Sequence, residues 1–210
     1  MGKINIYTSI YGGRDKLSRP KDEFLDGCDF ASFTGDGGLL DAKRHKVLPH
    51  RYFQDYEISV WIDGNVELLD NIRPIIRKFL RKGNMAVLRH PAESLEGVTP
   101  YMYREAEVCL LQGVGNPKDI KRQVDAYRKE GCPADREAVM LSVIIRRHNE
   151  PSVIEFDKEW WRQINKYSYR DQISFPYVAW KQDFKYSKLN NVGFDADWYK
   201  YNMHLRERVI

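Results

Sequence analysis

A short run of oxygen-bearing side chains follows a strongly β-forming stretch, residues 58–62. Asp63, Gly64 and Asn65 come directly after it. If the backbone stays extended past residue 62, alternation points Asp63 and Asn65 the same way, above a glycine that cannot block a ligand. Carboxylate and amide oxygens are the ligands that hard divalent cations prefer, and such a cation can hold a diphosphate. The alternative is a plain turn, because these residue types are also common in turns.

A basic cluster precedes this run, on a helix that the pattern predicts over residues 39–46. Lys43 and Lys46 are three positions apart, so they share one face of that helix. From there, both ammonium groups could reach phosphate oxygens near Asp63. The alternative is that the cluster forms an ordinary solvated helix face.

The composition limits the classes of protein to consider. The 210 residues suit one domain, residues 1–210, which could also be a piece cut from a longer chain. A net charge of +4 suits an anionic small ligand but is too small to indicate nucleic-acid binding. No apolar run has membrane-spanning length, and three widely spaced cysteines indicate neither a disulfide framework nor a zinc site. We expect a cytoplasmic protein (in the host cytoplasm if the chain is viral).

Strand and helix patterns alternate along the chain. Strands are predicted at residues 4–10, 28–34, 58–62, 85–88 and 140–145. Helices are predicted at residues 39–46, 70–82, 101–112 and 117–129 and from residue 151 onward, and residues 171–180 are predicted to form a helix or a turn. This order predicts an α/β/α sandwich around a largely parallel, mixed sheet. Ligands of such folds bind beyond the carboxyl ends of the strands, where residues 8–13 and Asp63 both lie.

Five segments, in order along most of the chain, together resemble a GT-A type glycosyltransferase domain. They read IYTSIYGG at 6–13, KRHKVLPH at 43–50, SVWIDGN at 59–65, IRRHN at 145–149 and RDQISF at 170–175. The likeness is to a glycosyltransferase-like family of plants and bacteria, and to the N-terminal glycosyltransferase domain of a multidomain chlorella-virus protein. The resemblance implies the Rossmann-like GT-A fold, a UDP-sugar donor held through Mn²⁺ or Mg²⁺, and a carbohydrate acceptor.

The resemblance also implies a metal site. In GT-A enzymes an Asp-x-Asp motif ends a strand and grips the metal that bridges the diphosphate. Here Asp63-Gly64-Asn65 resembles that motif, with a neutral amide as the second oxygen donor. Many relatives add a histidine near the C-terminus, which makes His204 the candidate third ligand and His148 the fallback.

Catalytic and donor-binding roles follow from the same resemblance. A related Asp-Gln pair lines the donor sugar in several GT-A families, which implies a catalytic role for Asp171 and contacts to sugar hydroxyls for Gln172. Asp171 would orient the sugar, deprotonate the acceptor or stabilise the cationic centre, or it could simply cap a helix. The donor-binding candidates are Thr8, Ser9, Tyr11, Gly12, Asp36, Lys43, Lys46, Asp63 and Gly64. His90 and Glu105 are weaker candidates for the acceptor side, and a buried Glu–Arg pair is the alternative for Glu105.

These observations predict a metal-dependent glycosyltransferase that moves a hexose or 6-deoxyhexose from a UDP-sugar to a carbohydrate acceptor. The metal would act as a Lewis acid on the leaving diphosphate. A sugar-nucleotide nucleotidyltransferase is one alternative, although the glycine-containing loop at residues 11–14 is short for it. A non-catalytic carbohydrate-binding module is the other, and Asn65 in place of an acid is the feature that favours it.

Overall fold

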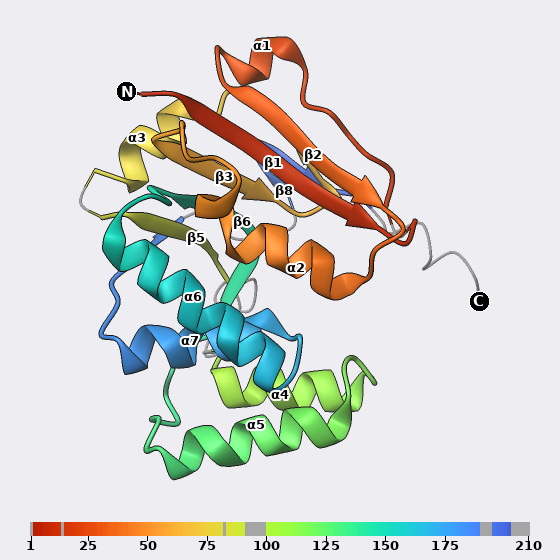
Figure 1. Cartoon of the computed structure of the whole chain (residues 1–210), viewed down its shortest axis with the longest axis vertical. Coiled ribbons are helices and arrows are strands. Elements are labelled where there is room, and N and C mark those ends of the chain that lie inside the picture. Colours follow the sequence, from red (N-terminus) through yellow and green to blue (C-terminus); the bar gives the residue numbers. More distant parts are fainter. Residues whose placement is uncertain (1, 14, 82, 91–99, 190–194, 203–210) are drawn as a thin grey trace.

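The computed structural model describes residues 2–13, 15–81, 83–90, 100–189 and 195–202 (Figure 1). Its centre is a six-stranded sheet in the order β2-β1-β3-β6-β5-β7. These strands are β1 (Ile4–Tyr11), β2 (Asp29–Gly35), β3 (Ile58–Ile62), β5 (Met85–Arg89), β6 (Val139–Arg146) and β7 (Ser187–Leu189). The expected α/β architecture is confirmed.

The sheet is mixed, and β6 runs against its five other strands. This places the N-terminal end of β6 beside the carboxyl ends of β3 and β5. The continuous apolar run of β6 suits a strand with neighbours on both sides and a helix layer over it. The edge of the sheet where a ligand is expected therefore combines strand ends with the beginning of β6.

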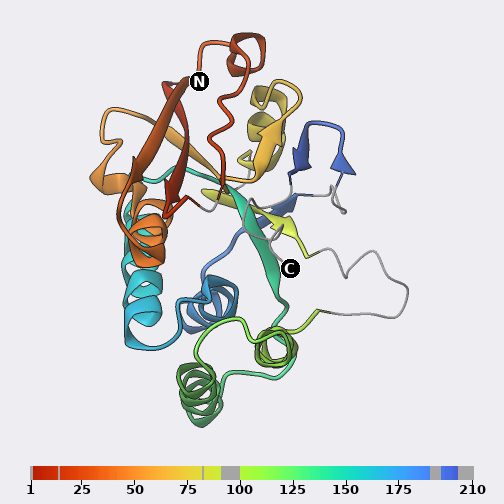
Figure 2. The ribbon, with the colours of Figure 1, turned by 90° about the vertical axis from the view of Figure 1, so that its right-hand side faces the viewer.

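Helices cover one face of the sheet: α2 (Leu39–Val47), α4 (Met102–Leu111), α5 (Pro117–Lys129), α6 (Pro151–Lys166) and α7 (Asp171–Lys181). Figure 2 shows α4 and α5 end-on as an adjacent pair. The other face holds α1 (Asp22–Leu25), α3 (Arg73–Phe79) and a small sheet of β4 (Val66–Leu68), β8 (Asp195–Ala196) and β9 (Tyr199–Tyr201). A 3₁₀ turn covers Pro49–Arg51.

Alternation along β3 follows the expected pattern. Ile58, Val60 and Ile62 pack into the cluster on the α3 side, while Trp61 packs into the helix layer that contains α6 and α7. Each buried apolar side chain of this size contributes about 1.5–3 kcal/mol, so the strand is firmly held where it ends at the site. The three cysteines are buried free thiols. None of the helices described is both long and apolar enough to cross a membrane.

The region after residue 65 differs from the prediction. Strand β4 comes first and pairs with β9, and α3 starts only at Arg73. Asp70 caps no helix, because its carboxylate accepts from the backbone N–H of Asn71. The side chain of Asn71 instead accepts from the N–H of Arg73. The pairing partner of β4 is remote in sequence, so local periodicity gave no sign of it.

A buried polar network fixes α2 against the sheet. The guanidinium of Arg146 on β6 lies 2.9 Å from Asp157 of α6, and both side chains are fully buried. Arg146 also donates to the hydroxyl of Tyr7, at 3.0 Å, and to the backbone carbonyl of Lys46. These contacts hold the C-terminal turn of α2, and so they position the helix from which Lys43 and Lys46 project.

Candidate active site

A cleft of about 490 Å³ opens at the carboxyl edge of β1 and β3. Its wall is built from the end of β1 and the segment after it, one face of α2, the turn after β3, the beginning of β6 and the beginning of α7. The predicted site residues that line it are Ser9, Tyr11, Gly12, Lys43, Lys46, Asp63, Gly64, Asn65, Asp171 and Gln172. The fold thus brings together segments that are far apart in sequence.

The backbone turns at Asp63 and does not stay extended. The N–H of Asp63 donates to the carbonyl of Ser142 at 2.8 Å, which continues the β3–β6 pairing by one residue. The N–H of Val66 then donates to the carbonyl of Asp63 at 2.9 Å, which closes a turn. The extended path expected here is therefore wrong, because the strand ends in a turn. Asp63 and Asn65 both line the cleft, so their role as metal ligands stays a prediction.

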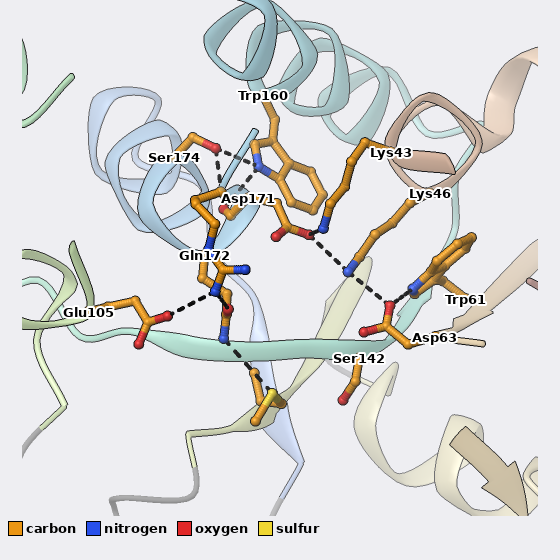
Figure 3. Close-up of polar contacts among 12 residues, drawn as sticks. Lys43, Lys46, Trp61, Asp63, Glu105, Ser142, Trp160, Asp171, Gln172 and Ser174 are labelled. Carbon is orange, nitrogen blue, oxygen red and sulfur yellow. Dashed lines mark hydrogen bonds and ion pairs between the residues drawn. The ribbon is translucent and has the colours of Figure 1, made fainter. Parts of the chain in front are cut away.

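A chain of alternating charges crosses one end of the cleft (Figure 3). The ammonium of Lys43 lies 2.7 Å from Asp171, and that of Lys46 lies 2.9 Å from the same carboxylate oxygen. Lys46 also lies 3.1 Å from Asp63, whose same oxygen accepts from the indole N–H of Trp61 at 2.7 Å. We call Lys43, Asp171, Lys46 and Asp63 the charged chain; in it, Lys46 joins the two carboxylates.

Burial and ion pairing shift the pKa values of these groups in opposite directions. Burial would raise the pKa of Asp171, but the ammonium groups of Lys43 and Lys46 outweigh it and hold that pKa far below its usual range. Burial lowers the pKa of Lys43 despite the attraction of Asp171. For Lys46, burial is outweighed by Asp171 and Asp63, which raise its pKa. At neutral pH Asp171 is an ionised carboxylate of low basicity, and Lys46 is a cation.

A second polar chain reaches the cleft at Arg170 and Gln172 and continues to Glu105, which does not line it (Figure 3 labels Gln172 and Glu105). Nη2 of Arg170 donates to Gln172 Oε1 at 3.0 Å and to Glu105 Oε1 at 3.4 Å. The amide nitrogen of Gln172 points to the sulfur of Met140 at 3.9 Å, and Glu105 lies 3.6 Å from the ring of His90. We call Glu105, Arg170 and Gln172 the amide chain. The Glu–Arg pair expected as the alternative for Glu105 is present, but it is only partly buried.

Asp171 begins α7 but does not cap it. Arg170 occupies the cap position, and no side chain there bonds the first turn. The backbone carbonyl of Asp171 accepts from the indole N–H of Trp160 at 3.3 Å, and the hydroxyl of Ser174 donates to the same carbonyl at 3.2 Å. With its backbone anchored in this way, the carboxylate of Asp171 is directed to the lysines of α2.

Three residues predicted to belong to the site do not line the cleft, and a fourth lies outside the described residues. Thr8 is buried and Asp36 is exposed, and neither lines the cleft. His148 is wrong as the fallback metal ligand, because the antiparallel course of β6 carries it to the opposite edge of the sheet. Its ring lies 2.7 Å from the carbonyl of Phe53. His204 lies outside the described residues, so its role stays a prediction.

The cleft also contains residues that the sequence gave no reason to select. Asp15 lies beside the turn, and a Cβ atom built on Gly64 would be 3.1 Å from its carboxylate and 3.0 Å from Ile10. A side chain at position 64 would therefore crowd Ile10 at the end of β1 and Asp15 after it, and both would have to shift slightly. Ser142 and Met140 enter from the beginning of β6. Only the antiparallel pairing of β6 with β3 brings them there.

The donor set at this edge suits a metal that is shared with a ligand. Within the described ranges, no three His, Cys, Asp or Glu side chains form a metal-binding group. The side chain of Asp63 keeps 36% of its surface exposed, and Asp15 and Asn65 line the same cleft. Mg²⁺ typically uses one or two protein carboxylates together with substrate phosphates and water, and carboxylates also suit Mn²⁺. These residues fit such an ion, but not an all-protein cage.

Sequence comparison connects this site to a known family. The family described as TOD1/MUCI70, glycosyltransferase-like domain, matches residues 40–201. The chain belongs to this family. The matched range contains both lysines, the Asp63 turn and the start of α7, while β1 lies before it. This match confirms the resemblance to a glycosyltransferase-like family that the sequence motifs indicated.

A relative of this TOD1/MUCI70 domain is the probable hexosyltransferase MUCI70 of Arabidopsis thaliana. The two are 32% identical over an alignment of 151 positions, and the match covers 67% of this chain and 25% of the relative. The chain therefore spans about a quarter of that relative's length.

Solved structures of similar fold include three glycosyltransferases. One is involved in glycosylation of the major capsid of PBCV-1 (12% identity, TM-score 0.40, covering 78% of this chain and 67% of that one). Mouse xyloside xylosyltransferase 1 shares 11% identity (TM-score 0.44, 89% and 84%). The bifunctional enzyme WbbM shares 8% identity (TM-score 0.47, 90% and 39%).

Proposed function

We propose that this TOD1/MUCI70 domain is a metal-dependent glycosyltransferase that moves a hexose or 6-deoxyhexose from a UDP-sugar to a carbohydrate acceptor. The observation that carries the proposal is the meeting of the Asp63 turn, the α2 lysines and the Asp171-Gln172 pair in one cleft. The cleft lies at the carboxyl strand edge, where α/β folds bind ligands. Membership of a glycosyltransferase-like family supports the same reaction class.

The charge of the cleft supports a metal. Among the described residues of its lining, three acids (Asp15, Asp63, Asp171) balance three bases (Lys43, Lys46, Arg170). A nucleotide diphosphate brings further negative charge, which this balanced lining does not offset. A bound divalent ion would offset it and, as a Lewis acid, would stabilise the leaving phosphate oxygen. Asp63 would hold the ion, with Asn65 and Asp15 nearby and His204 as the predicted further ligand.

The lysines and Asp171 would divide the remaining work. Lys43 and Lys46 would contact the diphosphate, and Asp171, which pairs with both ammonium groups, would hold them in position. A carboxylate with so low a pKa is a weak proton acceptor, which disfavours Asp171 as the base for the acceptor hydroxyl. Orienting the sugar and stabilising positive charge at its anomeric carbon are the roles that suit it. Ser9, Tyr11 and Gly12 line the side of the cleft proposed for the nucleoside.

The test is incubation with a panel of UDP-sugars, with and without Mn²⁺, while released UDP is measured. We expect slow hydrolysis to UDP without acceptor, dependent on the metal. Asp63→Ala should abolish the metal-dependent part of UDP binding, whereas Glu107→Gln, on an exposed face of α4, should change nothing. The proposal fails if no UDP-sugar is hydrolysed and UDP binding does not respond to Mn²⁺.

One observation favours a non-catalytic alternative. Asn65 is neutral, and one oxygen of Asp63 already contacts both Lys46 and Trp61. A carbohydrate-binding module on this fold would bind sugars without releasing UDP. The same panel decides between the two, because such a module would release no UDP from any UDP-sugar, with or without Mn²⁺.

A further inference from the structure

A second pocket lies beside the later half of α7, away from the cleft. Its volume is about 490 Å³, which is within the range of pockets that bind small molecules. The cleft meets the beginning of α7, whereas this pocket is lined by the second half of the helix, by the turn after it and by residues 135–137. Among the described residues, none lines both. We call this second pocket the α7 pocket.

Aromatic side chains form one part of its lining: Trp180, Phe184 and Tyr186. Each is half-buried and packs against a further aromatic ring of α6 or α7, with ring centroids 4.4–6.0 Å apart. The rings are therefore held in place before a ligand arrives. Their remaining exposed surface suits the flat side of a pyranose ring, because the C–H groups there are attracted to the negative face of an aromatic ring.

Charged groups of both signs form the rest of the lining. Asp135, Glu137 and Asp183 supply carboxylates, and Arg136 and Lys185 supply cations. Asp135 lies 3.6 Å from Arg136, and Asp183 pairs with Lys185. The Nε–H of Arg136 is buried and has no hydrogen-bond partner among the described residues. Such a lining suits a ligand rich in hydroxyl groups, which can donate to the carboxylates and accept from the cations.

The backbone at Asp183 is independent evidence that a carboxylate is used in the α7 pocket. Asp183 has a φ of 48°, in the left-handed region. Its N–H donates to the carbonyl of Trp180, and that of Phe184 donates to the carbonyl of Ala179, which is the Schellman motif that usually has glycine here. A side chain is less favourable than glycine in this conformation. The exposed ion pair with Lys185 contributes little, so stability does not explain the aspartate.

We infer that the α7 pocket is a second carbohydrate-binding site, in which a pyranose ring of an oligosaccharide stacks on Trp180 and donates a hydroxyl hydrogen bond to Asp183. Membership of a glycosyltransferase-like family agrees with a glycan as the ligand. A quaternary ammonium ion also suits aromatic rings beside carboxylates, but Arg136 and Lys185 would repel it. The inference goes beyond the reaction proposed for the cleft and does not depend on it.

The experiment is titration of the domain, without UDP or Mn²⁺, with cellotetraose, maltotetraose, mannotetraose and tetragalacturonate, followed by saturation-transfer NMR. At least one of them should bind, and its affinity should fall about tenfold in Trp180→Ala, which removes the stacking surface. Trp161→Ala is the matched control, because Trp161 is half-buried on α6 and does not line the α7 pocket. The affinity for UDP with Mn²⁺ should be unchanged in both variants.

A second variant, Asp183→Gly, separates binding from folding. Oligosaccharide affinity should fall about tenfold, because the carboxylate acceptor is lost. The midpoint of urea denaturation should not fall, because glycine suits the left-handed conformation. A lower midpoint with unchanged affinity would show that Asp183 is only structural and would contradict the inference. This variant also decides the matter if Trp180→Ala does not fold.

The outcomes separate this inference from the proposed function. The inference is wrong if no oligosaccharide binds, or if tetramethylammonium binds to the α7 pocket in place of an oligosaccharide. It is also wrong if Gln172→Ala abolishes oligosaccharide binding and Trp180→Ala does not, because the ligand would then lie in the cleft. If an oligosaccharide binds as expected but UDP does not bind with Mn²⁺, the proposed function is wrong and the inference stands.

Discussion

The two ends of the cleft use the same kinds of side chain in different ways. In the charged chain, two lysines and two aspartates contact one another directly, and Lys46 and Asp171 are almost fully buried. In the amide chain a single ion pair lies partly behind the wall, and Gln172 presents a neutral amide. Asp171 and Gln172 are adjacent in sequence, yet Asp171 belongs to the charged chain and Gln172 to the amide chain. Their side chains diverge because successive helical residues point about 100° apart.

This difference separates two kinds of role. A buried network of balanced charges is sensitive to the loss of any partner, because the charges left behind are unpaired. An amide held by a peripheral pair can change with little cost to the fold. We therefore expect substitutions in the charged chain to alter stability and reaction together, and those in the amide chain to leave stability nearly unchanged.

The largest effect is expected for Asp171→Asn. This change leaves Lys43 without its carboxylate and Lys46 with only Asp63. The free energy of unfolding should fall by about 3–5 kcal/mol, measured by urea denaturation, and UDP release should be lost. Gln172→Ala is the control, with an expected change below about 1 kcal/mol. Equal stability of the two variants would contradict the view that Asp171 holds the lysines.

The same variant has a pH signature. The folded-state pKa of Asp171 is depressed, so its contribution to stability is complete above the unfolded-state pKa of about 3.9 and is lost as the pH falls toward the folded-state pKa. The stability difference between wild type and Asp171→Asn should be constant above about pH 5 and shrink below about pH 4. Urea unfolding at several pH values checks this, and a difference that grows in acid would exclude it.

The next effect compares the two lysines. Lys46 contacts both carboxylates, whereas Lys43 contacts Asp171 alone and is more exposed. UDP affinity in the presence of Mn²⁺ should fall about 100-fold in Lys46→Met and about tenfold in Lys43→Met. Calorimetry measures both, and Arg44→Met, in the same helix but outside the cleft lining, is the control. The reverse order of the two losses would show that Lys46 does not join the two carboxylates in the working site.

The smallest effect concerns alkaline pH. Burial lowers the pKa of Lys43, so this side chain loses its charge at a lower pH than an exposed lysine, while Lys46 remains charged. UDP affinity should decline by about fivefold as Lys43 deprotonates, which is about 1 kcal/mol. Lys43→Arg should remove the decline, because arginine stays protonated. A decline that persists in this variant would place the titrating group elsewhere.

Prediction from sequence worked where the signal was local. Helical spacing placed Lys43 and Lys46 on one face of α2, and alternation assigned the buried sides of β3. It failed where pairing was remote. Strand β4 forms because β9 pairs with it, and His148 is far from the cleft because β6 runs antiparallel.

By itself, the sequence determined the α/β layering, the strand that ends at Asp63, the helix face that carries the lysines and the start of α7 at Asp171. Local propensity and periodicity are sufficient for each of these, because each depends on neighbours a few residues away. The tertiary structure alone decided which groups meet. Lys46 joins Asp63 to Asp171, Asp15 packs beside Gly64, and Glu105 neutralises Arg170 across 65 residues of chain. Such contacts depend on the relative placement of α2, α4, α7 and β6, which no local pattern specifies.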